Sequence, residues 1–117
     1  MKNLKNRVNL IGNLGTDPEI KTMDGGLKLA KMAIATNESY KNNKGEKVTE
    51  TQWHNLIAWG KTAEYFEKYA KTGSKAVIEG KLVNRNYVDK TGVKRYITEV
   101  VVEEVMLLGS ATRNEVD

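Results

Sequence analysis

Aromatic and basic side chains at a spacing of two are the residues of this sequence best suited to binding chemistry. Trp53 and Trp59 share a parity in a run typical of a β-strand, so both rings project from one face, about 20 Å apart at ~3.3 Å per residue. Lys81, Arg85 and Tyr87 share one face of a later run. Because every nucleobase has a π-face, stacking on an aromatic ring contributes ~1–3 kcal/mol per base whatever its identity. The pattern therefore indicates sequence-tolerant binding of single-stranded nucleic acid.

The alternative is that the tryptophans fill a core, because a tryptophan in a strand is more often buried than exposed. Residues of the opposite parity compete for that interior. They are apolar on both strands: Leu56, Ala58, Ala76, Ile78 and Leu82. These side chains can line a core without the tryptophans, which favours exposed rings.

Charge is distributed unevenly along the 117 residues, whose net charge is +4. Residues 1–16 hold three basic residues and no acid, and residues 81–98 hold five basic residues and one acid, whereas residues 99–117 are acidic. A fold that brings the two basic stretches together would attract a polyanion. A single lysine or arginine is usually only a solvated surface group, but neighbouring rings distinguish Lys81, Arg85 and Arg95. Tyr40 adds a ring beside the lysine-rich residues 41–47.

One short motif suggests an enzyme: Gly60-Lys61-Thr62 resembles the end of a phosphate-binding loop. That motif requires a glycine five residues before Gly60, and Asn55 stands there instead. With one histidine and no cysteine, a catalytic set or a metal site is hardly possible. His54 is interpreted as a packing or subunit-contact residue. We therefore expect a protein that is not an enzyme and uses no cofactor or metal.

Alternation of apolar and polar residues dominates the chain and predicts an all-β fold with one short helix. The helix is expected over residues 62–71, with Thr62 as N-cap and with Phe66 and Tyr69 in the core. Three strands, a helix and two strands form the order of a five-stranded OB-fold barrel. We expect one domain over residues 1–109 and a short, disordered extension over 110–117. The predicted strands cover residues 5–14, 28–37, 48–59, 75–87 and 94–108.

The sequence has no apolar run of the ~18–20 residues that cross a membrane, and its first residues lack the apolar stretch of a signal peptide. The absence of cysteine agrees with a reducing compartment. We expect a soluble, cytoplasmic protein without a membrane partner.

A family resemblance rests on a long motif at residues 8–19, VNLIGNLGTDPE. It is similar to the N-terminal signature of bacterial and mitochondrial single-stranded DNA-binding proteins. The resemblance spans about residues 4–109. Further matching stretches follow in the same order at residues 35–40, 51–54, 59–64, 73–74, 78–82 and 95–100.

The resemblance implies an OB-fold homotetramer that wraps single-stranded DNA during replication, recombination and repair, in the cytoplasm at the nucleoid. It also implies a role for His54 at a subunit contact, and pairing of the first strand, with Val8 and Leu10, against a second subunit. The implied base-stacking residues are Tyr40, Trp53, Trp59 and Tyr87. Beside them we expect DNA contacts from the basic residues Arg7, Lys61, Lys81, Arg85 and Arg95.

Two departures from the family pattern are visible. Asn55 stands where a basic residue is common, which lowers the expected number of phosphate contacts. The chain ends at Asp117 without the flexible tail and acidic tip through which many members recruit replication and repair enzymes. Either the tail was removed or this member lacks it, so recruitment of those proteins is not carried over.

Two rival binding functions share the same fold. An OB-fold accessory factor, such as a primosomal protein, would dimerise and lose the stacking rings, and here all four remain. An RNA-binding module of the cold-shock type would be separated by competition between DNA and RNA oligomers.

Overall fold

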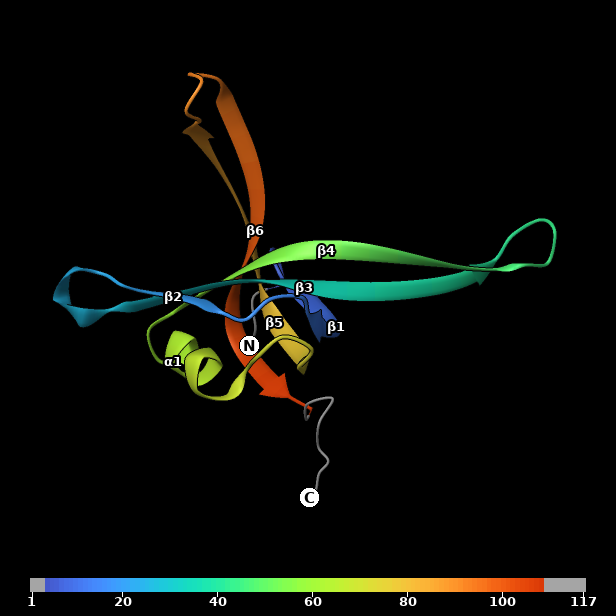
Figure 1. Cartoon of the computed structure of the whole chain (residues 1–117), viewed down its shortest axis with the longest axis horizontal. Coiled ribbons are helices and arrows are strands. Elements are labelled where there is room, and N and C mark those ends of the chain that lie inside the picture. The colour runs from blue at the N-terminus through green and yellow to red at the C-terminus, as the bar shows by residue number, and fades with distance from the viewer. Residues whose placement is uncertain (1–3, 109–117) are drawn as a thin grey trace.

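The computed structural model describes residues 4–108. It consists of six strands, one α-helix and one 3-10 turn (Figure 1). The predicted extension over residues 110–117 lies outside the described part. The elements are β1 (Val8–Leu14), β2 (Glu19–Thr22), η1 (Asp24–Gly26), β3 (Lys28–Lys41), β4 (Lys47–Trp59), α1 (Gly60–Tyr69), β5 (Lys75–Val88) and β6 (Lys94–Leu107).

Five of the strands close into a barrel. The sheet order is β1-β5-β6-β4-β3-β2, and β1 also pairs with β3, which joins the two ends. The β4–β6 pairing is parallel and the others are antiparallel. This is the predicted five-stranded OB-fold barrel with one helix, so the fold class is confirmed.

The additional strand β2 was not predicted. It pairs outside the barrel with the start of β3, from Glu19↔Lys31 to Thr22↔Lys28. Its four residues contain a single apolar side chain, Ile20, and three of the four are exposed. Such a short edge strand has no alternation for a pattern to reveal.

The helix starts two residues earlier than predicted, so the assignment of Thr62 as N-cap is wrong. The chain turns directly from β4 into α1 at Gly60, which has a left-handed φ of 61° that glycine adopts readily. Trp59 occupies the N-cap position and makes no side-chain capping hydrogen bond. The core assignment holds for Phe66, which is fully buried, but not for Tyr69, which is 57% exposed.

One parity of each barrel strand fills the core. Leu82 was expected inside but is 45% exposed. The β1 pairing with β5 ends at Gly80, so beyond that residue β5 has left the barrel wall. The buried cluster consists of Leu14, Ala30, Met32, Ile34, Leu56, Ala58, Ala63, Phe66, Ala76, Ile78, Val100 and Val102.

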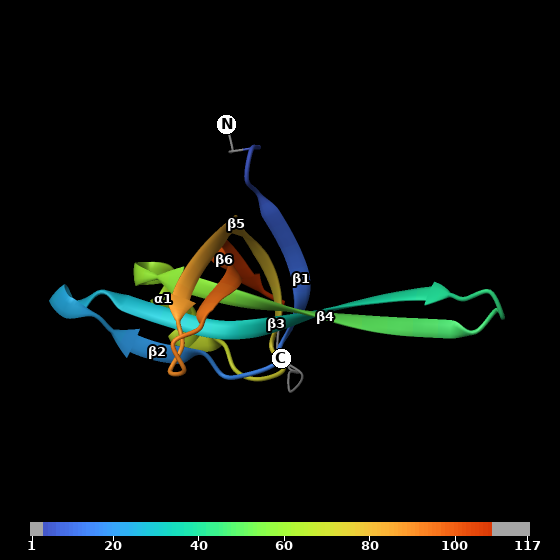
Figure 2. The ribbon, with the colours of Figure 1, turned by 90° about the horizontal axis from the view of Figure 1, so that it is seen from above.

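Two hairpins extend beyond the barrel as two-stranded arms (Figures 1 and 2). The β3–β4 arm continues in unbroken register to Lys41↔Lys47, and the β5–β6 arm to Val88↔Lys94. Both strands of the first arm are longer than predicted, because its polar residues outside the core carry a weak hydrophobic signal. The arms enlarge the surface on which exposed side chains can lie.

Barrel closure requires a close approach at Gly12. A Cβ at this position would overlap the backbone carbonyl oxygen of Ala35 on β3. Gly12 directly precedes Asn13 and Leu14, which pair with β3. The absence of a side chain therefore lets β1 pass from β5 to β3.

We predict that Gly12→Ala lowers the free energy of unfolding by roughly 1–3 kcal/mol or more, because overpacking here displaces backbone. Gly15→Ala is the matched control. Its new Cβ would meet only the far edge of the Trp53 ring, a part-exposed side chain that can move. Urea denaturation measures both variants, and equal stability of Gly12→Ala and the unmodified protein would contradict the closure argument.

Candidate nucleic-acid interface

Strand register defines one continuous surface on β3, β4, β6 and β5, here called the outer face. It consists of the side chains whose parity is opposite to that of the core residues. Across the strands, Asn55 pairs with Glu99, which pairs with Val83. The next row contains Ile57, Val101 and Lys81. The outer face includes Ala33, Ala35, Trp53, Asn55, Ile57, Trp59, Lys81, Val83, Arg85, Tyr87, Arg95, Ile97, Glu99 and Val101.

Three of the four predicted rings lie on the outer face, and all four are exposed. Trp53 is 61% and Trp59 43% exposed, so the alternative of a tryptophan core does not apply to this structure. Tyr87 is 45% exposed and faces Arg95 across the β5–β6 arm. Tyr40 is 49% exposed but has the parity opposite to that of the outer face, so it lies on the reverse face of the β3–β4 arm.

The Trp53 ring rests on bare backbone. Two atoms of its six-membered ring lie where a Cβ at Gly15 would stand, and a third lies within contact distance of that position. Gly15 follows β1, and its N–H donates to the carbonyl oxygen of Ala33 at 2.9 Å. Gly15 thus supports an exposed ring, a role that sequence reasoning missed. Its position in a glycine-containing turn was the only available signal.

All three predicted arginines are held by carboxylates. Arg7 Nε lies 2.6 Å from an oxygen of Glu79, and Arg95 Nε lies 2.8 Å from Asp89. Arg85 donates from Nε and Nη2 to the two oxygens of Glu99, at 2.7 and 3.1 Å. The predicted lysines differ, because within residues 4–108 neither Lys61 nor Lys81 has an ion-pair partner.

Glu99 lies at the centre of the outer face and is only 3% exposed. Asn55 and Val83 flank it on the neighbouring strands. The hydrogen bonds and the charge of Glu99 raise the pKa of the Arg85 guanidinium. The Arg85–Glu99 pair adds no net charge to the outer face. Sequence reasoning missed it because only the strand register shows which residues lie beside Glu99.

Asp89 organises the tip of the β5–β6 arm. Its carboxylate accepts hydrogen bonds from the hydroxyl and N–H of Thr91, the N–H of Val93 and Nε of Arg95. These bonds, that of the Thr91 hydroxyl first, lower the pKa of Asp89 to about 2. Asp89 is therefore ionised at neutral pH, and Arg95 remains paired with it beside Tyr87.

Comparison with known proteins agrees with this geometry. A family model described as "Single-strand binding protein family" matches residues 5–108. The chain belongs to the single-strand binding protein family. Single-stranded DNA-binding protein 1 of Xylella fastidiosa is 39% identical over 93% of this chain and 81% of its own length. Single-stranded DNA-binding protein 1 of Chlorobaculum tepidum is 41% identical over 90% of this chain, which spans only 65% of that relative.

A solved structure supports the same assignment. The Plasmodium falciparum SSB complex with ssDNA superposes with a TM-score of 0.83 at 27% sequence identity. The match covers 92% of this chain and 98% of that one. Members of the single-strand binding family are non-enzymatic DNA-binding proteins, so the chain is not an enzyme.

The residues predicted at subunit contacts occupy two places in this family member. Val8 and Leu10 are partly buried against the core, whereas Ile11 between them is 59% exposed. His54 is half-buried on the reverse face of the β3–β4 arm, with Nε2 lying 3.1 Å from the hydroxyl oxygen of Thr36.

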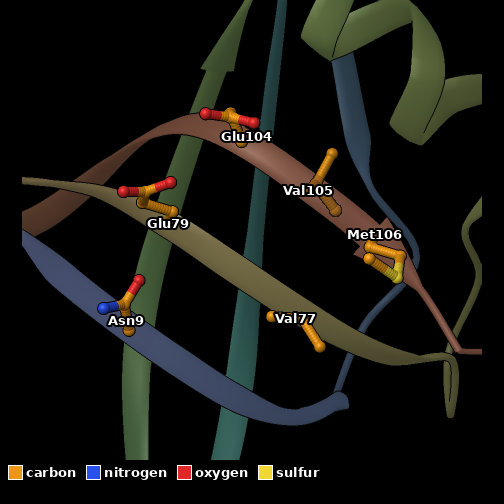
Figure 3. Close-up of a pocket in the computed structure, with 6 residues that line it drawn as sticks. All are labelled: Asn9, Val77, Glu79, Glu104, Val105 and Met106. Atoms are coloured by element: carbon orange, nitrogen blue, oxygen red, sulfur yellow. The ribbon is translucent and has the colours of Figure 1, made fainter. Parts of the chain in front are cut away.

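Within residues 4–108, no group of three or more histidine, cysteine or acidic side chains could hold a metal ion. The same part of the chain contains no helix with the length and apolar character to span a membrane. A pocket of about 230 Å³ opens on β1, β5 and β6, and none of the four rings lines it (Figure 3). Its lining residues are Asn9, Val77, Glu79, Glu104, Val105 and Met106.

We predict that Glu99→Gln strengthens binding of oligo(dT) and steepens its salt dependence. The amide keeps the shape of the carboxylate but leaves the charge of Arg85 unbalanced on the outer face. One additional phosphate contact on a single strand changes the slope of log affinity against log salt by about 0.7. Fluorescence titrations at several salt concentrations measure this slope.

Glu67→Gln is the matched control for this substitution. It removes the same charge from an ion pair with Lys28, at 2.6 Å, that lies off the outer face. Both variants are first checked for an unchanged melting temperature. An unaltered salt slope in Glu99→Gln would show that Arg85 does not lie on the phosphate path.

Proposed function

We propose that this chain binds single-stranded DNA without sequence preference, by stacking unpaired bases on the outer face. The observation that carries the proposal is the exposure of Trp53, Trp59 and Tyr87 on one surface of a closed barrel whose core is filled by the opposite parity. Tyr40 extends the set of stacking rings along the β3–β4 arm. The same ligand is supported by the two relatives, which are single-stranded DNA-binding proteins, and by the structural neighbour, which is a complex with ssDNA.

Phosphate contacts come from the basic residues around the rings. Lys61 stands in the first turn of α1, two residues after Trp59, and Lys81 lies on the outer face. Neither has a carboxylate partner within the described residues, so each can release counterions when it meets a phosphate. Arg7, Arg85 and Arg95 are held in place by their carboxylates and offer their remaining N–H groups.

The cellular role that fits this chemistry is coating and protecting unpaired strands. Sequence-tolerant stacking suits DNA that is transiently single-stranded in replication, recombination and repair. The chain would act in the cytoplasm, at the nucleoid.

We further propose that the chain assembles as a homotetramer. One edge of β1 pairs with β5 from Val8 to Asn13, whereas within residues 4–108 the other edge pairs with β3 only at Asn13 and Leu14. The open edge can pair with the same strand of a second copy. Ile11 beside it and Met106 on β6 are each 59% exposed and offer apolar surface for a subunit contact. His54 would contribute from the β3–β4 arm.

Titration with oligo(dT), followed by tryptophan fluorescence, tests the function. We expect quenching, because the indoles pass from water to contact with bases. Trp53→Ala should weaken binding by ~1–3 kcal/mol per stacked base with little change in melting temperature, since the ring is exposed. Unquenched emission at demonstrated saturation, or a fall in melting temperature typical of a core deletion, would contradict the proposal.

Two additional measurements on the same samples complete this test. Light scattering should give the mass of four 13.1 kDa chains, and a monomer mass would contradict the assembly while leaving the stacking intact. Competition with oligo(U) of equal length should leave the DNA bound if the ligand is DNA. Displacement at equal concentration would favour an RNA-binding function.

A further inference from the structure

The most exposed aromatic ring of the described chain has no role in the function proposed above. Tyr96 on β6 is 73% exposed, more than Trp53 at 61%. A tyrosine so exposed in a two-stranded arm contributes little to a core. Its exposure leaves the ring free to contact a partner outside the domain.

Register places Tyr96 on the reverse face of the β5–β6 arm. Tyr96 pairs with Asn86, whereas the neighbouring pair, Tyr87 and Arg95, belongs to the outer face. Because successive side chains of a strand alternate between faces, the Tyr87 and Tyr96 rings flank the arm on opposite sides. The arm projects from the barrel, so both of its faces are open (Figure 1).

The surroundings of Tyr96 fit a nucleic-acid base with its phosphate. Lys94 Nζ lies 5.7 Å from the ring centroid, a cation–π distance, and leaves part of the ring free. Asn86 across the strand is exposed and carries amide donors and an acceptor. Val88 is 68% exposed on the same face and adds apolar surface.

Charge on the arm favours a polyanion over a second protein. Residues 81–98 contain five basic side chains and a single acid, Asp89. Asp89 is already paired with Arg95. Lys90 and Lys94 have no ion-pair partner within residues 4–108, so the arm presents uncompensated positive charge.

We propose that Tyr96 and Lys94 form an additional base-stacking and phosphate-binding site for single-stranded DNA on the reverse face of the β5–β6 arm. This inference rests on the proposed function. A DNA strand that stacks one base on Tyr87 passes around the edge of the β5–β6 arm and stacks its next accessible base on Tyr96. The path is short, because the two β-strands of the arm lie only ~4.8 Å apart. Tyr40 has the corresponding reverse-face position on the other arm, so both arms carry DNA on two sides.

Affinity for a ladder of oligo(dT) lengths tests the site. Tyr96→Ala should bind the shortest oligomers, which cover only the outer face, as well as the unmodified protein does. It should bind longer oligomers about 5-fold to 150-fold more weakly, the range that one base–aromatic stack contributes. Tyr96→Phe keeps the ring and should keep the affinity at every length.

Tyr69→Ala is the matched control. Tyr69 is also an exposed tyrosine with a lysine over its ring, Lys68 at 5.6 Å, but it lies on α1. We expect no change in oligo(dT) affinity at any length. A length-dependent loss in Tyr69→Ala equal to that in Tyr96→Ala would overturn the assignment to Tyr96.

Photocrosslinking identifies the contact directly. Oligonucleotides containing 5-iododeoxyuridine should crosslink to Tyr96 as well as to Trp53, with the sites assigned by mass spectrometry. Crosslinks at Trp53 without Tyr96, together with full affinity of Tyr96→Ala, would overturn this inference and leave the proposed function standing. Absence of both crosslinks, together with full affinity of Trp53→Ala, would overturn the proposed function itself. A lower mass of Tyr96→Ala by light scattering at unchanged DNA affinity would overturn the inference in favour of a contact between copies.

Discussion

Closure of the barrel by β1 is the constraint on which the rest of the structure depends. Once β1 joins β5 to β3, each strand has one face toward a small closed interior. Apolar side chains of one parity, with Phe66 from the helix, fill that interior. The remaining parity must face outward, and this places Trp53 and Trp59 in solvent although large aromatic side chains usually favour burial. Gly12 makes the closure possible by letting two backbones meet.

Positive and negative side chains around the exposed rings balance each other more closely than the composition of the chain suggests. Each arginine nominated for DNA binding is paired with a carboxylate, and Glu99 brings a negative charge into the middle of the outer face. We therefore expect stacking, at ~1–3 kcal/mol per base, to contribute more to affinity than any paired arginine. The bidentate contact holds the Arg85 guanidinium in a fixed orientation. We expect the long-range attraction of DNA to come mainly from the lysines.

The sequence was sufficient to predict the barrel and the exposure of its rings, because period-two alternation reports directly which parity is apolar. It was insufficient wherever a result depended on which strands become neighbours. The Arg85–Glu99 pair, the ring of Trp53 over Gly15 and the exposure of Leu82 all follow from register or from the point where β5 leaves the barrel. The edge strand β2 was missed because four largely exposed residues carry no periodic signal. The base-stacking, basic and subunit-contact assignments for individual residues remain predictions.

The central claim is that outward-facing side chains bind DNA while inward-facing ones form the core. Methyl-detected NMR with oligo(dT) tests it most directly, because the methyl signals of the two sets are observed separately. Stacked bases shift nearby methyl signals through their ring currents. We expect large shifts for the outer-face methyls of Val83 and Ile97 and negligible shifts for the buried methyls of Ile34 and Ile78. Shifts of equal size in both sets, or shifts confined to the Ile11 surface around β1, would contradict the account.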